Sequence, residues 1–105
     1  MTVPTEPATL AEVMDDLSRR GFTEHFTVVD HRLRVVGKGD TFPPDRVTVV
    51  EYHRFEGISD PDDMAILYGI ETWSGIRGTL TDAFGFYADP LVGDFMKDVA
   101  VSRPG

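Results

Sequence analysis

The sequence predicts an α+β domain in which an antiparallel sheet of about five strands packs against an N-terminal and a C-terminal helix. Two observations indicate this class. Apolar residues recur at helical spacing near each end of the chain, and between these segments they alternate with polar residues, as in half-buried strands. The length of 105 residues suits one core, so we expect a single domain over 1–105 with an ordered core at about 9–101 and flexible ends at 1–8 and 102–105.

The N-terminal helix is predicted over residues 10–20. Thr9 and Glu12 match a capping box, in which two side chains satisfy free backbone donors of the first turn. Gly21 stands where a left-handed glycine commonly ends a helix. The residues expected to face the core form one apolar stripe: Leu10, Val13, Met14 and Leu17.

Five strands are expected between the two helices. The first two form a hairpin around Asp-His-Arg, and a Ser-Gly pair suits the tight turn between the last two. A glycine-rich loop and a proline-rich turn separate the hairpin from the other three strands. The predicted strands are 26–30, 33–36, 47–56, 63–73 and 76–84.

The C-terminal helix is predicted to begin at Pro90. Asp89 is a favoured capping residue, and proline is favoured at the first helical position, where its missing N–H costs no hydrogen bond. The apolar face that follows consists of Leu91, Val92, Phe95, Met96 and Val99.

Composition excludes several classes of function. The net charge is −8, and it lies mostly in residues 51–105, with four basic and ten acidic side chains. Such a surface repels phosphate backbones, so we expect no direct nucleic-acid binding. The absence of cysteine excludes disulfides and thiolate metal sites. The chain shows no signal peptide and no apolar run of the ~20 residues that a membrane helix needs, so we expect a cytoplasmic protein without membrane contact.

Several polar residues conflict with the strand pattern. If alternate residues share a face throughout, Glu51, His53, Tyr68 and Asp82 all point toward the helices, with Asp82 opposite Ile66. An unpaired buried carboxylate is strongly unfavourable. Three interpretations follow: a pocket lined by these groups, a satisfied structural network, or a β-bulge that turns Glu51 and His53 to solvent.

The segment 56–63 is rich in carboxylates and joins two predicted strands beside Arg54. It lacks the alternating ligand pattern of a calcium loop, and Asp-Pro-Asp is an ordinary turn sequence. We therefore expect no metal and no cofactor. The carboxylates are Glu56, Asp60, Asp62 and Asp63.

The chain resembles a family of short bacterial proteins of about 100 residues, which often carry the label phosphoribosylpyrophosphate synthetase. The shared residues are Arg20-Gly-Phe-Thr23, Phe26, Arg54-Phe-Glu-Gly-Ile-Ser-Asp-Pro-Asp-Asp63, Ile66, Tyr68 and Gly78-Thr-Leu-Thr-Asp-Ala-Phe-Gly-Phe-Tyr87. The signature of phosphoribosyl enzymes, two acids followed by a threonine-glycine-threonine loop, is absent, because Asp62-Asp63 is followed by Met-Ala-Ile. The resemblance therefore does not imply synthetase activity.

Some similar proteins carry cysteine pairs, as in a zinc knuckle, at turns that correspond to 36–39 and 73–75. This chain has Val-Gly-Lys-Gly and Trp-Ser-Gly there, so the resemblance implies that the two turns are neighbours without a metal.

The favoured interpretation is a non-enzymatic module that binds a small molecule or a protein. Its candidate binding residues are Arg54, Glu56, Asp60, Asp62, Asp63, Tyr68 and Asp82. One alternative is a small hydrolase or transferase with His53 as general base, oriented by Glu51 or Asp82. Another is an acidic inhibitor that imitates nucleic acid. An exposed edge strand would also allow a homodimer.

Overall fold

The computed structural model describes residues 10–55, 65–83 and 89–101. The capping residue Thr9, the ends predicted to be flexible and the acidic loop with Glu56, Asp60, Asp62 and Asp63 lie outside these ranges.

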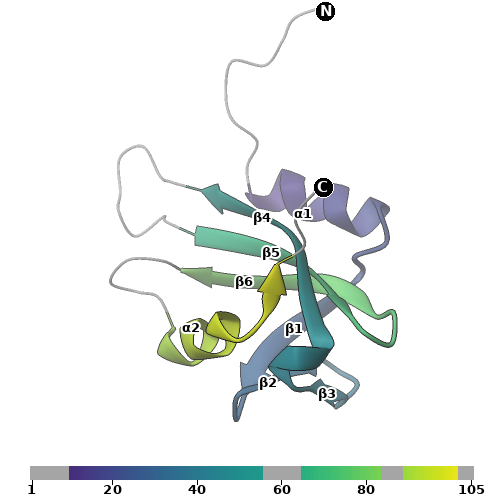
Figure 1. The fold of residues 1–105 in the computed structure, drawn as a ribbon. Coiled ribbons are helices and arrows are strands. Elements are labelled where there is room, and N and C mark those ends of the chain that lie inside the picture. Colours follow the sequence, from purple (N-terminus) through teal and green to yellow (C-terminus); the bar gives the residue numbers. More distant parts are fainter. Residues whose placement is uncertain (1–9, 56–64, 84–88, 102–105) are drawn as a thin grey trace, which may run out of the picture.

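Two helices and a seven-stranded sheet make up this part of the chain, and the predicted α+β class is confirmed (Figure 1). In chain order the elements are α1 (Leu10–Arg19), β1 (Glu24–Val29), β2 (Arg32–Val35), β3 (Thr41–Phe42), the short 3₁₀ helix η1 (Pro44–Arg46), β4 (Val47–Phe55), β5 (Ala65–Thr72), β6 (Arg77–Ala83), α2 (Pro90–Lys97) and β7 (Ala100–Val101).

The strand order is β3-β2-β1-β6-β5-β4-β7. The five predicted strands correspond to β1, β2, β4, β5 and β6. The sheet is mixed rather than wholly antiparallel, because β1 pairs with β6 and β7 pairs with β4 in parallel. Sequence periodicity did not indicate β3 and β7, because a strand of two residues is too short to show an alternation.

Local chemistry explains where the elements begin and end. Gly21 closes α1 at φ +105°, as predicted. Asp30 and His31 both have positive φ, 52° and 59°, which is the backbone of a two-residue hairpin turn whose twist matches the strands. The Asp89 carboxylate accepts a hydrogen bond from the Leu91 N–H at 2.9 Å, which confirms the predicted cap of α2.

The two helices lie on opposite faces of the sheet. α1 packs with Phe22, Leu67 and Phe55 on one face. α2 packs on the other face, in a larger cluster to which β1, β2, β4, β5 and β6 all contribute. The buried residues of the larger cluster are Phe26, Val28, Leu33, Val35, Val47, Val49, Ile70, Leu80, Val92, Phe95 and Val99.

The hairpin turn between β1 and β2 is attached to the end of α2. His31 Nε2 lies 3.0 Å from the Asp98 carboxylate, and the His31 ring meets the Phe95 ring edge-on at 6.0 Å. This contact holds α2 against the β1–β2 half of the sheet.

The parallel junction between β1 and β6 depends on the absence of a side chain at Gly78. A Cβ at this position would lie 2.3 Å from the Glu24 carbonyl oxygen, which is a backbone atom in the paired strand. We expect Gly78→Ala to lower the free energy of unfolding by about 2 kcal/mol or more, because the strands must separate to accept the methyl group. Urea unfolding measures this change.

Gly93→Ala is the matched control. Gly93 lies in α2, and a Cβ there would meet no described atom within 4 Å beyond its chain neighbours and the backbone of the helix itself. Alanine should therefore stabilise the protein by up to about 1 kcal/mol through helix propensity alone. If Gly78→Ala proved as stable as Gly93→Ala, the close approach of β1 and β6 would be wrong.

Candidate functional site

A β-bulge in β4 decides which side chains face each helix. Val49 pairs with Ile70 and Glu51 pairs with Gly69, so Val50 is one extra residue on the β4 side. An extra residue reverses the face of every residue that follows it. Val47 and Val49 therefore pack in the α2-side core, whereas Glu51, His53 and Phe55 point to the α1 side.

The bulge corrects the expectation that four polar residues share one face. Glu51 and His53 lie on the α1 side, and Tyr68 and Asp82 lie on the α2 side. The predicted pairing of Asp82 with Ile66 is confirmed. The bulge was one of the three interpretations, but it turns Glu51 and His53 toward α1, where their side chains are 27% and 38% exposed.

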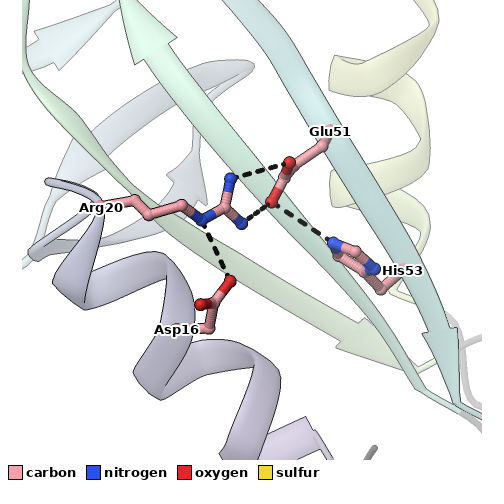
Figure 2. A network of polar contacts seen from close by, with 4 residues as sticks. All are labelled: Asp16, Arg20, Glu51 and His53. Atoms are coloured by element: carbon pink, nitrogen blue, oxygen red, sulfur yellow. Dashed lines mark hydrogen bonds and ion pairs between the residues drawn. The ribbon is translucent and has the colours of Figure 1, made fainter.

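On the α1 side, Glu51 is bound by an arginine that follows the helix (Figure 2). Arg20 Nη1 donates to Glu51 Oε2 at 3.2 Å, and Nη2 donates to Oε1. Arg20 Nε donates to the Asp16 carboxylate at 3.0 Å, one helical turn earlier. The guanidinium thus bridges α1 and β4 in a fork that matches the carboxylate.

His53 is a weaker partner of the same carboxylate. Its Nε2 lies 3.4 Å from Glu51 Oε1 (Figure 2). The hydrogen bonds from Arg20 lower the pKa of Glu51, and His53 adds a smaller effect in the same direction. The contact with Glu51 raises the pKa of Arg20 in turn. Because Arg20 already occupies the Glu51 carboxylate, the network's clear role is to fix α1 on the sheet.

On the α2 side, a hollow of about 250 Å³ lies between α2 and the edge of the sheet. Its lining combines one cation and two phenols with an apolar floor. The lining residues are Val49, Tyr52, Arg54, Ile66, Tyr68 and Met96. Arg54 and Tyr68 are two of the residues predicted to bind a ligand, and the structure brings them together here.

Asp82 lies near this hollow and belongs to its electrostatic environment. Burial raises the pKa of Tyr68, the negative charge of Asp82 raises it further, and the positive charge of Arg54 opposes them. Asp82 Oδ1 also accepts the Asp89 N–H at 3.1 Å, so this carboxylate is attached to the start of α2. Asp82 therefore lies on the α2 side, on the opposite face of the sheet from His53.

A second hollow, of about 380 Å³, lies at the other end of β4. Trp73 borders it and is 71% exposed, with the Arg46 guanidinium 5.0 Å from its ring centre. The sequence interpretation assigned no role to this tryptophan. The lining residues are Thr48, Val50, Glu71, Thr72, Trp73 and Gly75.

Sequence reasoning missed one contact on each side of the sheet: that of Arg20 with Glu51 on the α1 side, and that of Tyr52 and Met96 with the hollow on the α2 side. The sequence places Arg20 at the end of a helix and in the motif shared with the short bacterial family, and nothing in the local pattern indicates a partner 31 residues away. Tyr52 lies between Glu51 and His53 in sequence and therefore points to the opposite face of β4. Recognition of the bulge would have placed Tyr52 beside Tyr68. Met96 was predicted as part of the apolar face of the second helix, and its position at the hollow depends on how α2 packs.

No set of three or more histidine and acidic side chains among the described residues is grouped closely enough to hold a metal ion. In the same part of the chain, every buried side-chain nitrogen and oxygen has a hydrogen-bond partner. Neither α1 nor α2 has the length and apolar character of a membrane-spanning helix.

Comparisons with known proteins return no match, whether with family models, with curated proteins or with solved structures. The resemblance to the short bacterial family therefore stays a prediction from its motifs, and the site must be interpreted from its own geometry.

The Arg20–Glu51 contact can be tested with Glu51→Gln, which removes the charge and keeps the shape. We expect the free energy of unfolding to fall by about 1 kcal/mol near neutral pH, as for a partly exposed charged pair. Because the folded pKa of Glu51 is lowered, the pair stabilises the fold above the unfolded value of about 4.3 and loses this effect as the pH falls through the folded pKa. Urea unfolding of both proteins across this range should show the difference vanish in acid.

Asp15→Asn provides the control, since Asp15 forms an exposed ion pair with Arg19 at 2.8 Å within α1. Its effect should stay within about 0.5 kcal/mol. A Glu51→Gln protein as stable as Asp15→Asn at neutral pH would show that the Arg20 contact does not fix the helix.

Proposed function

We propose that the protein is a non-enzymatic binding module and that its ligand site is the hollow beside α2. The observation that carries the proposal is the grouping of Arg54, Tyr52 and Tyr68 around an apolar floor. An apolar hollow with a few convergent polar groups is the usual form of a small-molecule site.

The chemistry of the lining selects a small organic anion. The Arg54 guanidinium offers a fork of N–H donors that suits a carboxylate or a phosphate. The floor of Val49, Ile66 and Met96 suits an apolar or aromatic part of the same molecule. The volume of about 250 Å³ is below the ~300 Å³ at which drug-sized pockets begin, so the ligand would be a small one.

The state of Tyr68 supports the same assignment. Burial and the charge of Asp82 raise the pKa of its phenol, so the hydroxyl stays protonated at neutral pH. A protonated phenol donates a hydrogen bond to an anionic oxygen. Tyr68 and Arg54 would then bind the charged end of the ligand together.

The acid–base enzyme has less support. Asp82 lies on the opposite side of the sheet from His53 and cannot orient it. Glu51 is occupied by Arg20, and neither of the two hollows described above is lined by His53. The acidic inhibitor rests on the net charge of −8 alone.

The proposal can be tested with phenyl phosphate and benzoate as probes, because each joins an anion to one aromatic ring. We expect the Met96 methyl and the Tyr68 ring resonances to shift in NMR spectra as either probe is added. Arg54→Gln should weaken binding at least about tenfold, since a hydrogen bond to a charged group contributes more than about 1.4 kcal/mol.

Arg46→Gln is the matched control, because it removes an arginine that stacks on Trp73 at the other end of β4. It should leave the Met96 shifts unchanged. Thermal unfolding of both variants separates lost binding from lost structure. Probe binding that Arg54→Gln leaves intact, or shifts confined to Trp73, would contradict the assignment.

A further inference from the structure

The first three strands expose a positively charged face in an otherwise acidic protein. The α2-side core buries every second residue of β1 and β2, so the residues between them are exposed on the opposite face. α1 packs on β4 and β5 through Phe55 and Leu67, and the three strands lie away from it (Figure 1). We call this surface the β1–β3 face. It includes Thr27, Val29, Arg32, Arg34, Val36 and Thr41.

Strand register arranges these side chains in rows. Thr27 pairs with Arg34, and Arg34 pairs with Thr41, so this arginine lies between two threonines. In the next row Val29 pairs with Arg32. The two arginines are separated by one residue of β2, which sets them about 6.7 Å apart along the strand. The face therefore presents two guanidinium groups at the repeat of an extended chain.

The charge of both arginines is left without a carboxylate partner in the described part of the chain. Arg32 Nε donates to the Thr41 hydroxyl at 3.1 Å, and this neutral partner does not offset the positive charge. The acids nearest in sequence, Asp30 and Asp40, form no ion pair with either arginine. Basic side chains elsewhere do pair with carboxylates, and these are Arg19, Arg20, Lys38, Arg77 and Lys97.

We propose that the β1–β3 face binds an acidic segment of a partner protein in extended conformation, with carboxylates at alternate positions. Alternate side chains of an extended segment lie on one side and repeat at the spacing of those on β2. Two carboxylates separated by one residue can therefore meet Arg32 and Arg34 together, each through the N–H fork of a guanidinium. They also relieve the repulsion between two neighbouring positive charges.

Exposed valines extend the pattern beyond the arginines. Val36 follows Arg34 by two residues and is 54% exposed, and its N–H donates to the His25 carbonyl at 2.9 Å, so strand pairing continues to this point. Val29, opposite Arg32, is 40% exposed. An apolar side chain two residues from the second carboxylate would contact Val36 and leave water. The expected segment is acid-x-acid-x-apolar.

A peptide suits this face better than a nucleic acid does. The β1–β3 face holds no phenylalanine, tyrosine or tryptophan on which bases could stack. The net charge of −8 repels a phosphate backbone, whereas a short peptide meets only the local positive charge. The face also lies on the opposite side of the sheet from the hollow beside α2, so this inference does not rest on the proposed function.

The spacing is tested by fluorescence anisotropy with the labelled peptide Ser-Glu-Thr-Glu-Thr-Val-Ser at low salt. The permuted peptide Ser-Glu-Glu-Thr-Thr-Val-Ser has the same charge and composition, but in an extended chain its two carboxylates point to opposite sides. We expect the first peptide to bind at least about threefold more tightly, since one exposed ion pair is lost in the second. Equal affinity for the two peptides would overturn the inference, and this comparison needs no variant protein.

Substitution tests the arginines. The double change Arg32→Gln with Arg34→Gln should weaken binding of the first peptide at least about tenfold, because both ion pairs are lost. Arg19→Gln is the matched control, since it removes one exposed arginine of α1, and it should leave the affinity unchanged. Thermal unfolding checks that each variant is folded.

NMR locates the bound peptide. The Val29 and Val36 methyl resonances should shift during the titration, and the Met96 methyl resonance beside α2 should not. Shifts confined to Met96, or no binding at millimolar peptide, would overturn the inference. So would tighter binding of a single-stranded oligothymidylate, which would make the face a nucleic-acid site. These titrations contain no phenyl phosphate or benzoate, so failure at the hollow and failure at this face are separate results.

Discussion

The arrangement of polar groups in this protein depends on the single extra residue at Val50. A strand alternates between two faces, and one insertion exchanges them for everything downstream. Before the bulge, β4 contributes Val47 and Val49 to the α2-side core. After it, the same strand directs Glu51 and His53 to the α1 side and Tyr52 and Arg54 to the α2 side. One residue thus separates a structural ion network from a candidate binding site.

The two sides consequently have different chemistry. On the α1 side, charges neutralise one another: Arg20 bridges Asp16 and Glu51, and the helix is attached to the sheet. On the α2 side, Tyr52, Arg54 and Tyr68 border a hollow, and Tyr68 also packs against the larger core. An ion network between a helix and a sheet favours stability, whereas a cation and two phenols around an apolar hollow are typical of a ligand site. The proposed function follows from this difference.

Much of the fold was accessible from the sequence, because it is determined by local signals. Asp89 before Pro90 predicted the start of α2, and Gly21 predicted the end of α1. The pairing of Asp82 with Ile66 followed from a short turn and strict alternation. Such signals act over a few residues, so they can be read without tertiary information.

The rest depends on contacts between distant segments. Nothing in Val47–Phe55 marks Val50 as the bulged residue, because valine suits every position of a strand. The partner of Glu51 was not visible in the sequence either, because Arg20 meets Glu51 only when α1 packs on the sheet. The parallel pairing of β1 with β6 likewise follows from global packing. Faces and partners therefore needed the structure, whereas most element boundaries did not.

The narrow junction between β1 and β6 has a consequence for how the chain folds. The antiparallel pairs all join strands that are consecutive in sequence, whereas His25 and Thr79 at the junction are 54 residues apart. Closing so long a loop lowers the entropy of the chain before the contacts of the large core have formed to offset this loss. We therefore expect two ribbons, β1–β2–β3 and β4–β5–β6, to form early and independently. Their docking at Glu24 and Gly78 would then be the slow event that commits the chain to its native topology.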